Sequence, residues 1–528
     1  MGLFQFLFVR NKNKKLGKTT QEELFEREDI EKEYYTNLEK NKKLIQDTFN
    51  ETVDFKLEKI KLGKTDACVC YLGTMLDKQS LINSVLQGVS EKKELQPLKD
   101  MEAIRDTYFP SLAFQYAKNF HQVVWNILNG YAVIMVDGFK EALSIEVGQT
   151  EYRSIVEPST QTIIRGPKDA FIEDINTNIS LIRRRIKNPR LKFESYYIGR
   201  DSNTTVAIAF IEKIVNKDIL EEVRRRITEI ETGGVLDSGN LEEFIVDKTF
   251  TPFPLIFNTE RPDSISGHLL EGKVAIMVDG SPFVLSVPTV LTDFFQSTED
   301  YYQPFLMGSF TRLIRYTSFM IALLFPSLYV AISTFHHELL PTPLLISVQA
   351  QREGVPFPAV IEILIMELTF EVLREAGIRM PRVVGQTVSI VGALVIGQAA
   401  VEAGLVSNVL VIVVALTGIA SFVSPIYNFS ISTRLLRFLL IFCAAGMGLY
   451  GVLMFLVLMV IHLVSLRSFG VPYLAPVAPF RLADQKDLFI RLPAWINTRR
   501  PTYLKTQSPV KAKEKDRPSP PSRKDKGK

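Results

Sequence analysis

The sequence predicts a mixed fold, in which two related α/β subdomains precede a polytopic, all-α membrane domain. Residues 1 to about 305 are rich in Lys, Glu and Arg, whereas residues 310 to 466 are mostly apolar. In the apolar half, uncharged runs approach or exceed the ~20 residues that a helix needs to cross a bilayer. We therefore expect a charged lead-in (1–50), two α/β subdomains (51–155 and 156–305), a transmembrane helical domain (306–470) and a polar, basic tail (471–528).

The overall composition excludes several classes of protein. A formal net charge of +4 over 528 residues is too small to suggest a nucleic-acid binder. The three cysteines, Cys68, Cys70 and Cys443, are too few for a disulfide scaffold and fit a reducing compartment. The first 15 residues lack the apolar length of a signal peptide, so we expect the soluble half to be cytoplasmic.

The charged half contains an internal repeat. A strand and a helix (ACVCYLG, SLINSVLQGVSE) recur about 140 residues later as TTVAIAFIE and KDILEEVRRRITEI. Each pair is followed by two apolar runs joined at an Asp-Gly pair, Asp137-Gly138 or Asp279-Gly280, which is typical of a hairpin. Aligning Gly130 with Gly272 matches eight of fifteen positions. The pattern indicates a duplicated α/β unit, and two unrelated hairpins with the same turn are the alternative.

The soluble half shows no motif for catalysis. It contains no Walker loop, no GxGxxG after a strand, no HExxH and no GxSxG. Its histidines do not pair at ligand spacing, so we expect no metal, no cofactor and no enzyme activity. The arginine clusters at 183–185 and 224–226 fit solvated helix faces, or contacts with a subunit or with lipid headgroups.

One apolar run, from Val383 to Val401, contains several small residues, which would let neighbouring helices approach closely, and it carries a polar stripe. At 100° per residue, five side chains fall on one face: Thr387, Val391, Leu394, Gln398 and Glu402. The stripe fits either a helix buried in a bundle or the wall of a pore. In the pore interpretation, Val391 and Leu394 form an apolar constriction and Glu402 lies at one mouth.

A second unusual segment is AVIEILIMELTFEVLREAG, residues 359–377. Glu362 lies on one face of the predicted helix, and the opposite face carries Glu367, Glu371, Arg374 and Glu375. Carboxylates facing hydrocarbon cost several kcal/mol, so we expect an amphipathic helix in the membrane plane or a helix that lines a water-filled cavity. The i,i+3 spacing predicts that Arg374 pairs with Glu371.

The remaining apolar runs predict four to six crossings, with both termini on the cytoplasmic side. The run 438–466 contains Gly446 and Gly448 and fits either one tilted helix or a tight hairpin. Basic residues at 312–315, 379–382 and 434–437 suggest that those connections face the cytoplasm.

Short motifs between about Glu157 and Phe480 carry a family resemblance: Glu157-Pro158, Arg165-Gly166-Pro167, Asn178 with Arg183-Arg184-Arg185, Pro252-Phe253-Pro254, Thr259-Glu260-Arg261-Pro262, Asp279-Gly280-Ser281-Pro282, Glu299-Asp300-Tyr301-Tyr302, Arg315-Tyr316, Pro326-Ser327-Leu328-Tyr329-Val330, Leu340-Pro341, Gln351-Arg352-Glu353-Gly354, Arg374-Glu375-Ala376-Gly377 and Gly392-Ala393-Leu394-Val395-Ile396-Gly397. On these motifs, the chain resembles the A subunit of the GerA-type nutrient germinant receptors of endospore-forming bacteria.

The resemblance implies a function and a location. Such receptors lie in the spore inner membrane and trigger germination when nutrients appear. It implies as partners a permease-like B subunit, a lipoprotein C subunit and further A subunits, which would enclose an ion path lined by the polar stripe. A relative associated with the dipicolinic-acid release channel shares most of the motifs and is an alternative. A transporter component and a non-conducting membrane scaffold are others, although the membrane half shows no inverted repeat.

Overall fold

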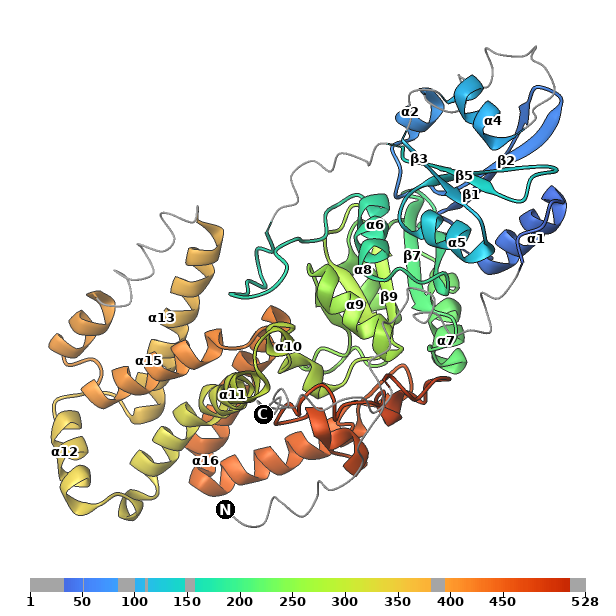
Figure 1. Ribbon diagram of the computed structural model, residues 1–528. Helices are drawn as coiled ribbons and strands as arrows, with labels where there is room; N and C mark the ends of the chain where they lie inside the picture. The colour runs from blue at the N-terminus through green and yellow to red at the C-terminus, as the bar shows by residue number, and fades with distance from the viewer. Residues whose placement is uncertain are drawn as a thin grey trace, which may run out of the picture. The chain divides into compact units, whose positions relative to one another are not determined.

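The computed structural model describes residues 33–50, 52–83, 100–109, 113–147, 157–380 and 395–512 (Figure 1). The chain divides into two compact units. The first takes in residues 1–50 and 54–151, and the second takes in residues 51–53 and 152–528.

The first unit is an antiparallel five-stranded sheet with helices on both faces. The strand order is β1-β2-β4-β5-β3. Helices α1 and α5 share one apolar core with the sheet, and α2 and α4 share the other. Because both faces of the sheet are covered, β4 is apolar and buried along its whole length, and β2 is buried from Ala67 onward. The bounds are α1 Leu38–Thr48, β1 Phe55–Leu62, β2 Thr65–Leu72, α2 Lys78–Leu81, α4 Met101–Tyr108, β3 Phe114–Ala117, α5 Phe120–Leu128, β4 Ala132–Val136 and β5 Ala142–Ile145.

The second unit begins with a sheet of equivalent topology, which we call subdomain 2. Its strand order, β6-β7-β9-β10-β8, repeats that of the first sheet element by element. Helices α6 and α9 cover one face, and α7 and α8 cover the other. The bounds are α6 Ile175–Arg185, β6 Leu191–Ile198, β7 Thr204–Ile211, α7 Lys217–Thr228, α8 Ser238–Ile245, β8 Phe257–Thr259, α9 Pro262–Glu271, β9 Val274–Val278 and β10 Val284–Val287.

The Asp-Gly pair has the same contacts in both copies. Both hairpins predicted from it are present, as β4–β5 and β9–β10. Each glycine has a φ near +90°, which a residue with a side chain rarely adopts. The Asp137 carboxylate accepts the N–H at the start of α1, at 2.9 Å, and Asp279 accepts the equivalent N–H of α6, at 3.3 Å. The turn therefore also anchors a helix N-terminus, which explains why both residues recur.

A buried asparagine with the same hydrogen bonds is a second feature that the two copies of the fold have in common. The Asn178 side chain accepts the Ile172 N–H, at 2.9 Å, and donates to the Ile172 carbonyl, at 2.6 Å. Asn41 in α1 makes the same two bonds with Tyr35. Each asparagine thus satisfies both backbone groups of a residue six positions earlier, in the segment that leads into its helix.

We expect Asn178→Ala to destabilise subdomain 2 by about 2 kcal/mol, because two backbone polar groups lose their partners. Differential scanning calorimetry of the purified full-length chain in detergent would show a lower unfolding midpoint. Asn176→Ala, on the exposed face of the same helix, is the matched control. Equal midpoints for the two variants would contradict the assignment.

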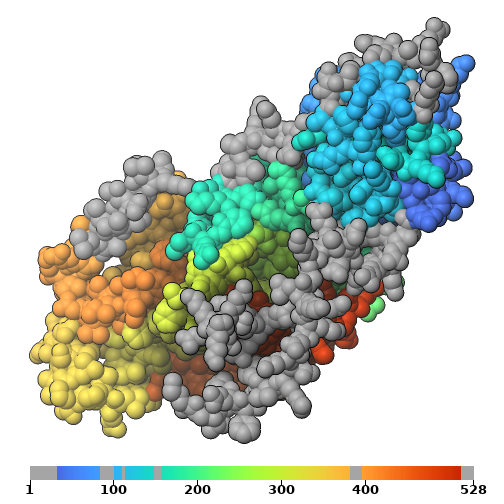
Figure 2. All heavy atoms as spheres, in the orientation of Figure 1, coloured from blue at the N-terminus to red at the C-terminus, as the bar shows by residue number. Residues whose placement is uncertain are grey.

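The rest of the second unit is mostly helical. Two helices, α11 (Phe305–Thr334) and α16 (Tyr427–Ser465), are long and apolar enough to cross a membrane. The apolar helix α15 is shorter, and the 21-residue helix α13 carries several charges. In Figure 2 the yellow atoms of α12 lie next to the orange atoms of α15, in agreement with their contacts. The other bounds are η4 Leu291–Phe294, α10 Glu299–Tyr302, η5 His337–Leu339, α12 Thr342–Arg352, α13 Ala359–Arg379 and α15 Asn408–Phe422.

Helix α16 is broken at Gly448. The glycine has φ +60° and ψ −141°, which are not helical angles. Residues 443 and 451 would be ~12 Å apart along a continuous helix, yet a Cβ added to Gly451 would strike the Cys443 carbonyl. The chain therefore turns back on itself, as the hairpin alternative predicts. Each half falls within the roughly 17 to 25 residues that one crossing takes.

Contacts at the helix ends show the direction of three segments: α11 and the first half of α16 run parallel, and the second half of α16 runs antiparallel to both. Phe429, at the start of α16, packs on Phe294 of subdomain 2, and His462, near its end, hydrogen-bonds Thr251 at 2.9 Å. The break at Gly448 lies against the far end of α11. Thus α11 leads away from subdomain 2, and α16 leads away and returns.

After α16 the chain returns to subdomain 2. Phe469, Val471 and Ala475 enter the core that covers one face of the sheet. Farther on, Asn216 donates to the Leu504 carbonyl, at 3.2 Å. This returning segment, the red ribbon of Figure 1, contains β11 Arg467–Ser468, β12 Val471–Pro472, η6 Leu482–Asp487 and η7 Thr502–Leu504.

Candidate functional site

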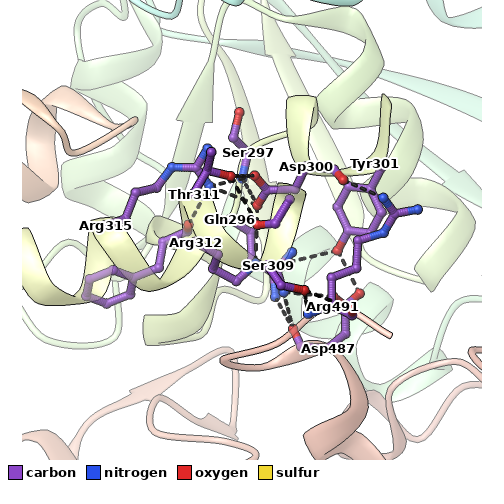
Figure 3. Close-up of polar contacts among 12 residues, drawn as sticks. Gln296, Ser297, Asp300, Tyr301, Ser309, Thr311, Arg312, Arg315, Asp487 and Arg491 are labelled. Carbon is purple, nitrogen blue, oxygen red and sulfur yellow. Dashed lines mark hydrogen bonds and ion pairs between the residues drawn. The ribbon is translucent and has the colours of Figure 1, made fainter. Parts of the chain in front are cut away.

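A cluster of buried polar contacts lies where subdomain 2 meets α11 (Figure 3). We call it the junction, and define it as Asp300, Tyr301, Arg312, Arg315, Asp487 and Arg491. Asp300, in α10, is almost fully buried and accepts bonds from two arginines of α11. Arg312 Nε lies 3.2 Å from one oxygen, and Arg315 Nη1 lies 2.8 Å from both.

The returning segment completes the junction. Arg312 Nη1 donates to an Asp487 carboxylate oxygen, at 2.8 Å, and to the Asp487 carbonyl, at 2.7 Å. The Tyr301 hydroxyl donates to the other carboxylate oxygen, also at 2.7 Å. Arg491 donates to the carbonyls of Asp300 and Gln303. Residues nearly 200 positions apart therefore hold the start of α11 from two sides.

Burial sets the electrostatics of the junction. The Arg312 side chain is fully buried, so its charge depends on Asp300 and Asp487 for compensation. Removing one partner of such a pair leaves an uncompensated charge in a medium of low dielectric constant, which is strongly destabilising. Burial, reinforced by the Asp487 charge, raises the pKa of the Tyr301 hydroxyl well above its usual value. Tyr301 therefore stays protonated and donates.

An aromatic layer lies beside these charges. Phe295 stacks on Tyr316 of α11, with ring centroids 4.2 Å apart. Phe294 stacks on Phe429 of α16, at 5.3 Å, and Phe429 also stacks on Phe319 of α11, at 5.3 Å. The phenylalanines that follow the sheet thus contact both long helices.

A buried ion pair ties that layer to the sheet. Lys273, just before β9, donates to Asp293 of η4, at 2.6 Å, and both side chains are almost fully buried. The same Asp293 oxygen accepts the Val290 N–H, at 2.9 Å. A continuous chain of contacts therefore runs from the sheet through Asp293 and Phe294 to α16. This arrangement can transmit a displacement of subdomain 2 to the helices.

The predicted acidic segment is α13, and its first carboxylates are buried. Glu362 lies 3.2 Å from an Arg352 guanidinium nitrogen and accepts the Ser407 N–H, also at 3.2 Å. Glu367 lies 3.0 Å from Arg437 of α16. Both faces of α13 are thus buried where these two residues lie.

The other charges of this segment have different environments. Glu371 contacts Arg434, at 2.5 Å, and Arg437, at 3.1 Å. Arg374 lies 4.0 Å from Glu371, so the predicted pair is present at long range, while its closest polar contact is the Ser421 hydroxyl. Glu375 is exposed and pairs with Arg379. The main partners of Glu371 are therefore the arginines of α16.

Part of the predicted polar stripe lies outside the described residues, namely Thr387, Val391 and Leu394. Gln398 and Glu402 lie in a described helical stretch, residues 395–402, and both are exposed. Gln398 Nε2 donates to Glu402, at 2.9 Å. Among the described residues, no three His, Cys, Asp or Glu side chains gather as a metal-binding group.

The sequence did not single out the residues of the junction as a site. Arg312, Arg315, Arg434 and Arg437 were interpreted only as markers of connections that face the cytoplasm, and the structure places all four within helices, where they pair with carboxylates. A signal was present for the first two, because arginines spaced i,i+3 follow the acidic Glu299-Asp300 pair within the same stretch of sequence, Arg312 being twelve positions after Asp300. Nothing local pointed to Asp487, which lies in the segment expected to be a tail.

Comparison with known proteins identifies the family. The sequence model described as "Bacillus/Clostridium GerA spore germination protein" matches residues 43–503. The chain belongs to the GerA family. This confirms the resemblance drawn from the short motifs, and it gives the chain a role in spore germination.

Two relatives and one solved structure illustrate the similarity of this GerA protein to others. "Spore germination protein KA" of Bacillus subtilis (strain 168) is 45% identical over 88% of this chain and 86% of its own length. "Spore germination protein GerLA" of Bacillus cereus is 40% identical over 91% of this chain and 98% of its own. The crystal structure of the N-terminal domain of the A subunit of the Bacillus megaterium spore germinant receptor GerK3 is 32% identical, covering 49% of this chain and 98% of that domain, with a TM-score of 0.39.

Proposed function

We propose that this GerA protein is the A subunit of a nutrient germinant receptor in the spore inner membrane. In this proposal it works with a permease-like B subunit and a lipoprotein C subunit. Several copies assemble into a nutrient-gated ion channel, and the α/β half lies on the cytoplasmic, spore-core side. Family membership and the two long apolar helices support a membrane subunit of this kind.

The junction is the observation that carries the mechanism. A subunit that converts a signal into a change of membrane helices needs a stiff connection between its soluble and helical parts. The buried pairs of Arg312 and Arg315, together with the aromatic contacts of Phe294, supply such a connection. Packed interiors are bistable rather than continuously deformable, so a small displacement of subdomain 2 is passed on as a discrete shift of α11 and α16.

The first experiment tests the receptor role. Spores that lack this chain are expected to lose nutrient-triggered potassium release for at least one nutrient, while the total potassium freed by boiling the spores serves as a control for an intact core. Potassium is measured in the medium with an ion-selective electrode. Unchanged release for every nutrient would contradict the proposal.

The second experiment tests the pore. If the stripe lines an ion path, Leu394→Ser should wet the apolar constriction and allow leakage without nutrient, because a narrow apolar ring blocks ions by remaining dry. Val391→Ala should act in the same direction, and Glu402→Gln should slow cation release without loss of assembly. Ile390→Ala, off the stripe, is the matched control. Leakage no greater in Leu394→Ser than in Ile390→Ala would place the pore elsewhere.

A further inference from the structure

A cleft of about 500 Å³ lies in the second unit, beside the junction. Its walls come from α9, from residues 160–163, from the linker 296–301 and from the loop 422–426 that joins α15 to α16. Binding sites for small molecules commonly measure about 300–1,000 Å³. The cleft is therefore large enough for a ligand, and one wall belongs to the connection between two apolar helices.

Because the fold is duplicated, the wall of the cleft formed by α9 can be compared with the equivalent helix of the first copy, α5. With Gly130 aligned to Gly272, three asparagines of the first copy correspond to ionisable residues in or just before α9: Asn119 to Arg261, Asn126 to His268 and Asn129 to Glu271. The structural bond survives the exchange, because Asn126 bonds Ser144 at 2.8 Å and His268 bonds Ser286 at 2.9 Å. The fold can thus be built with neutral residues here, and all three ionisable replacements line the cleft.

The charges in the cleft do not balance. Three of the charged residues that line the cleft form ion pairs with residues outside the lining. Arg261 pairs with Asp263, Asp293 with Lys273 and Arg315 with Asp300. This leaves two carboxylates, Glu271 and Glu299, and one ammonium group, Lys511, which lies 3.9 Å from Glu271.

His268 does not compensate the excess negative charge of the cleft. Burial, reinforced by Lys273, lowers the pKa of His268 well below its usual value, so its ring is neutral. Among the residues that line the cleft, the unmatched charge is therefore negative. A ligand that carries a positive charge would compensate this negative charge.

Two residues that line the cleft carry donor groups without a partner, and others supply an apolar surface. The Nε of Arg261 is buried without a partner, although the side chain is only 3% exposed. The Thr298 hydroxyl is likewise buried without a partner. An unpaired buried donor costs about 1–3 kcal/mol, which an oxygen acceptor on a ligand would recover. Phe257 and Ile426 supply apolar contacts.

We propose that this cleft binds a compound with a primary ammonium group and a neighbouring oxygen acceptor. The ammonium group pairs with Glu271 and Glu299, and the oxygen accepts from Arg261. Free ethanolamine and the headgroup of an ethanolamine phospholipid share this chemistry. Because residues 296–301 belong both to the cleft and to the connection into α11, an occupant would stiffen the junction. That consequence rests on the proposed function, whereas binding itself does not.

The test uses the purified full-length chain in detergent, with the thermal unfolding midpoint measured during titration with ethanolamine or choline. Both are cationic, but choline has no N–H donors. We expect a saturable rise with ethanolamine and a much smaller one with choline. Nanodiscs of phosphatidylethanolamine and phosphatidylcholine repeat the comparison for lipid, so a response confined to nanodiscs identifies the headgroup as the source.

Glu271→Gln and Glu299→Gln should each weaken binding of the primary amine about tenfold, because a charge-assisted hydrogen bond becomes a neutral one. Glu243→Gln, on the exposed surface of α8 and outside the cleft, is the matched control. Equal responses to ethanolamine and choline in both formats would overturn the proposal, as would unchanged affinity in both cleft variants. Failure of the proposed function would appear separately, as normal potassium release from spores without this chain.

Discussion

Replacing Asp300 with alanine is expected to prevent the chain from accumulating in the spore membrane. The change removes the shared acceptor of two guanidinium groups, that of Arg312, which is fully buried, and that of Arg315, which is 11% exposed. Breaking a buried pair by removing one partner costs about 3–5 kcal/mol, which is a large part of the stability of a typical domain. Immunoblots of purified spore membranes measure the amount of chain.

The control for this variant is Asp201→Ala, because Asp201 lies on an exposed turn of subdomain 2. Its abundance should match that of the unmodified chain, since exposed pairs contribute at most about 1 kcal/mol. Full abundance of Asp300→Ala, together with an unchanged unfolding midpoint, would show that the junction does not hold α11 in place.

A second large effect is expected in the helical bundle. Arg437 of α16 is fully buried between Glu367 and Glu371 of α13. Arg437→Met should abolish assembly, because it leaves a buried carboxylate, Glu367, without its cation. The measurement is again abundance in spore membranes, together with the size of the detergent-extracted complex by gel filtration.

A double variant separates charge compensation from packing. Replacing both members of a buried ion pair with apolar residues is often neutral. Arg437→Met combined with Glu367→Leu should therefore recover much of the lost abundance, with Glu371 still compensated by Arg434. Leu439→Met, at an exposed apolar position of α16, is the control for a change of shape without a change of charge. If the double variant is no better than Arg437→Met alone, the effect lies in packing.

The sequence predicted those parts of the fold that depend on local chemistry. Both hairpins were predicted from their Asp-Gly pairs, Asp137-Gly138 and Asp279-Gly280, because the geometry of such a turn depends on only two residues. For residues 438–466 the sequence left a single tilted helix and a tight hairpin open, since a glycine such as Gly448 permits a break in a helix without requiring one. The edge strand β1, FKLEKIKL, was missed because its charged, alternating sequence becomes a strand only by pairing with β2.

The candidate site was less predictable because its contacts are remote in sequence. The four carboxylates of α13 showed that partners were needed, but Arg434 and Arg437 lie more than 60 positions away on another helix. Arg312 meets Asp487 across 175 positions. No periodicity or spacing rule connects such residues, and only the packed structure brings them together.

Potassium release from spores carrying Arg315→Gln tests the central claim, that the junction couples subdomain 2 to the helices. Arg315 contributes to the junction from its edge, so Asp300 keeps Arg312 as a partner and the chain should still assemble. At matched abundance, we predict slower release for every nutrient that the receptor senses, whereas Arg379→Gln, at an exposed position of α13, releases potassium normally. Normal release kinetics in Arg315→Gln spores with normal abundance would contradict the claim.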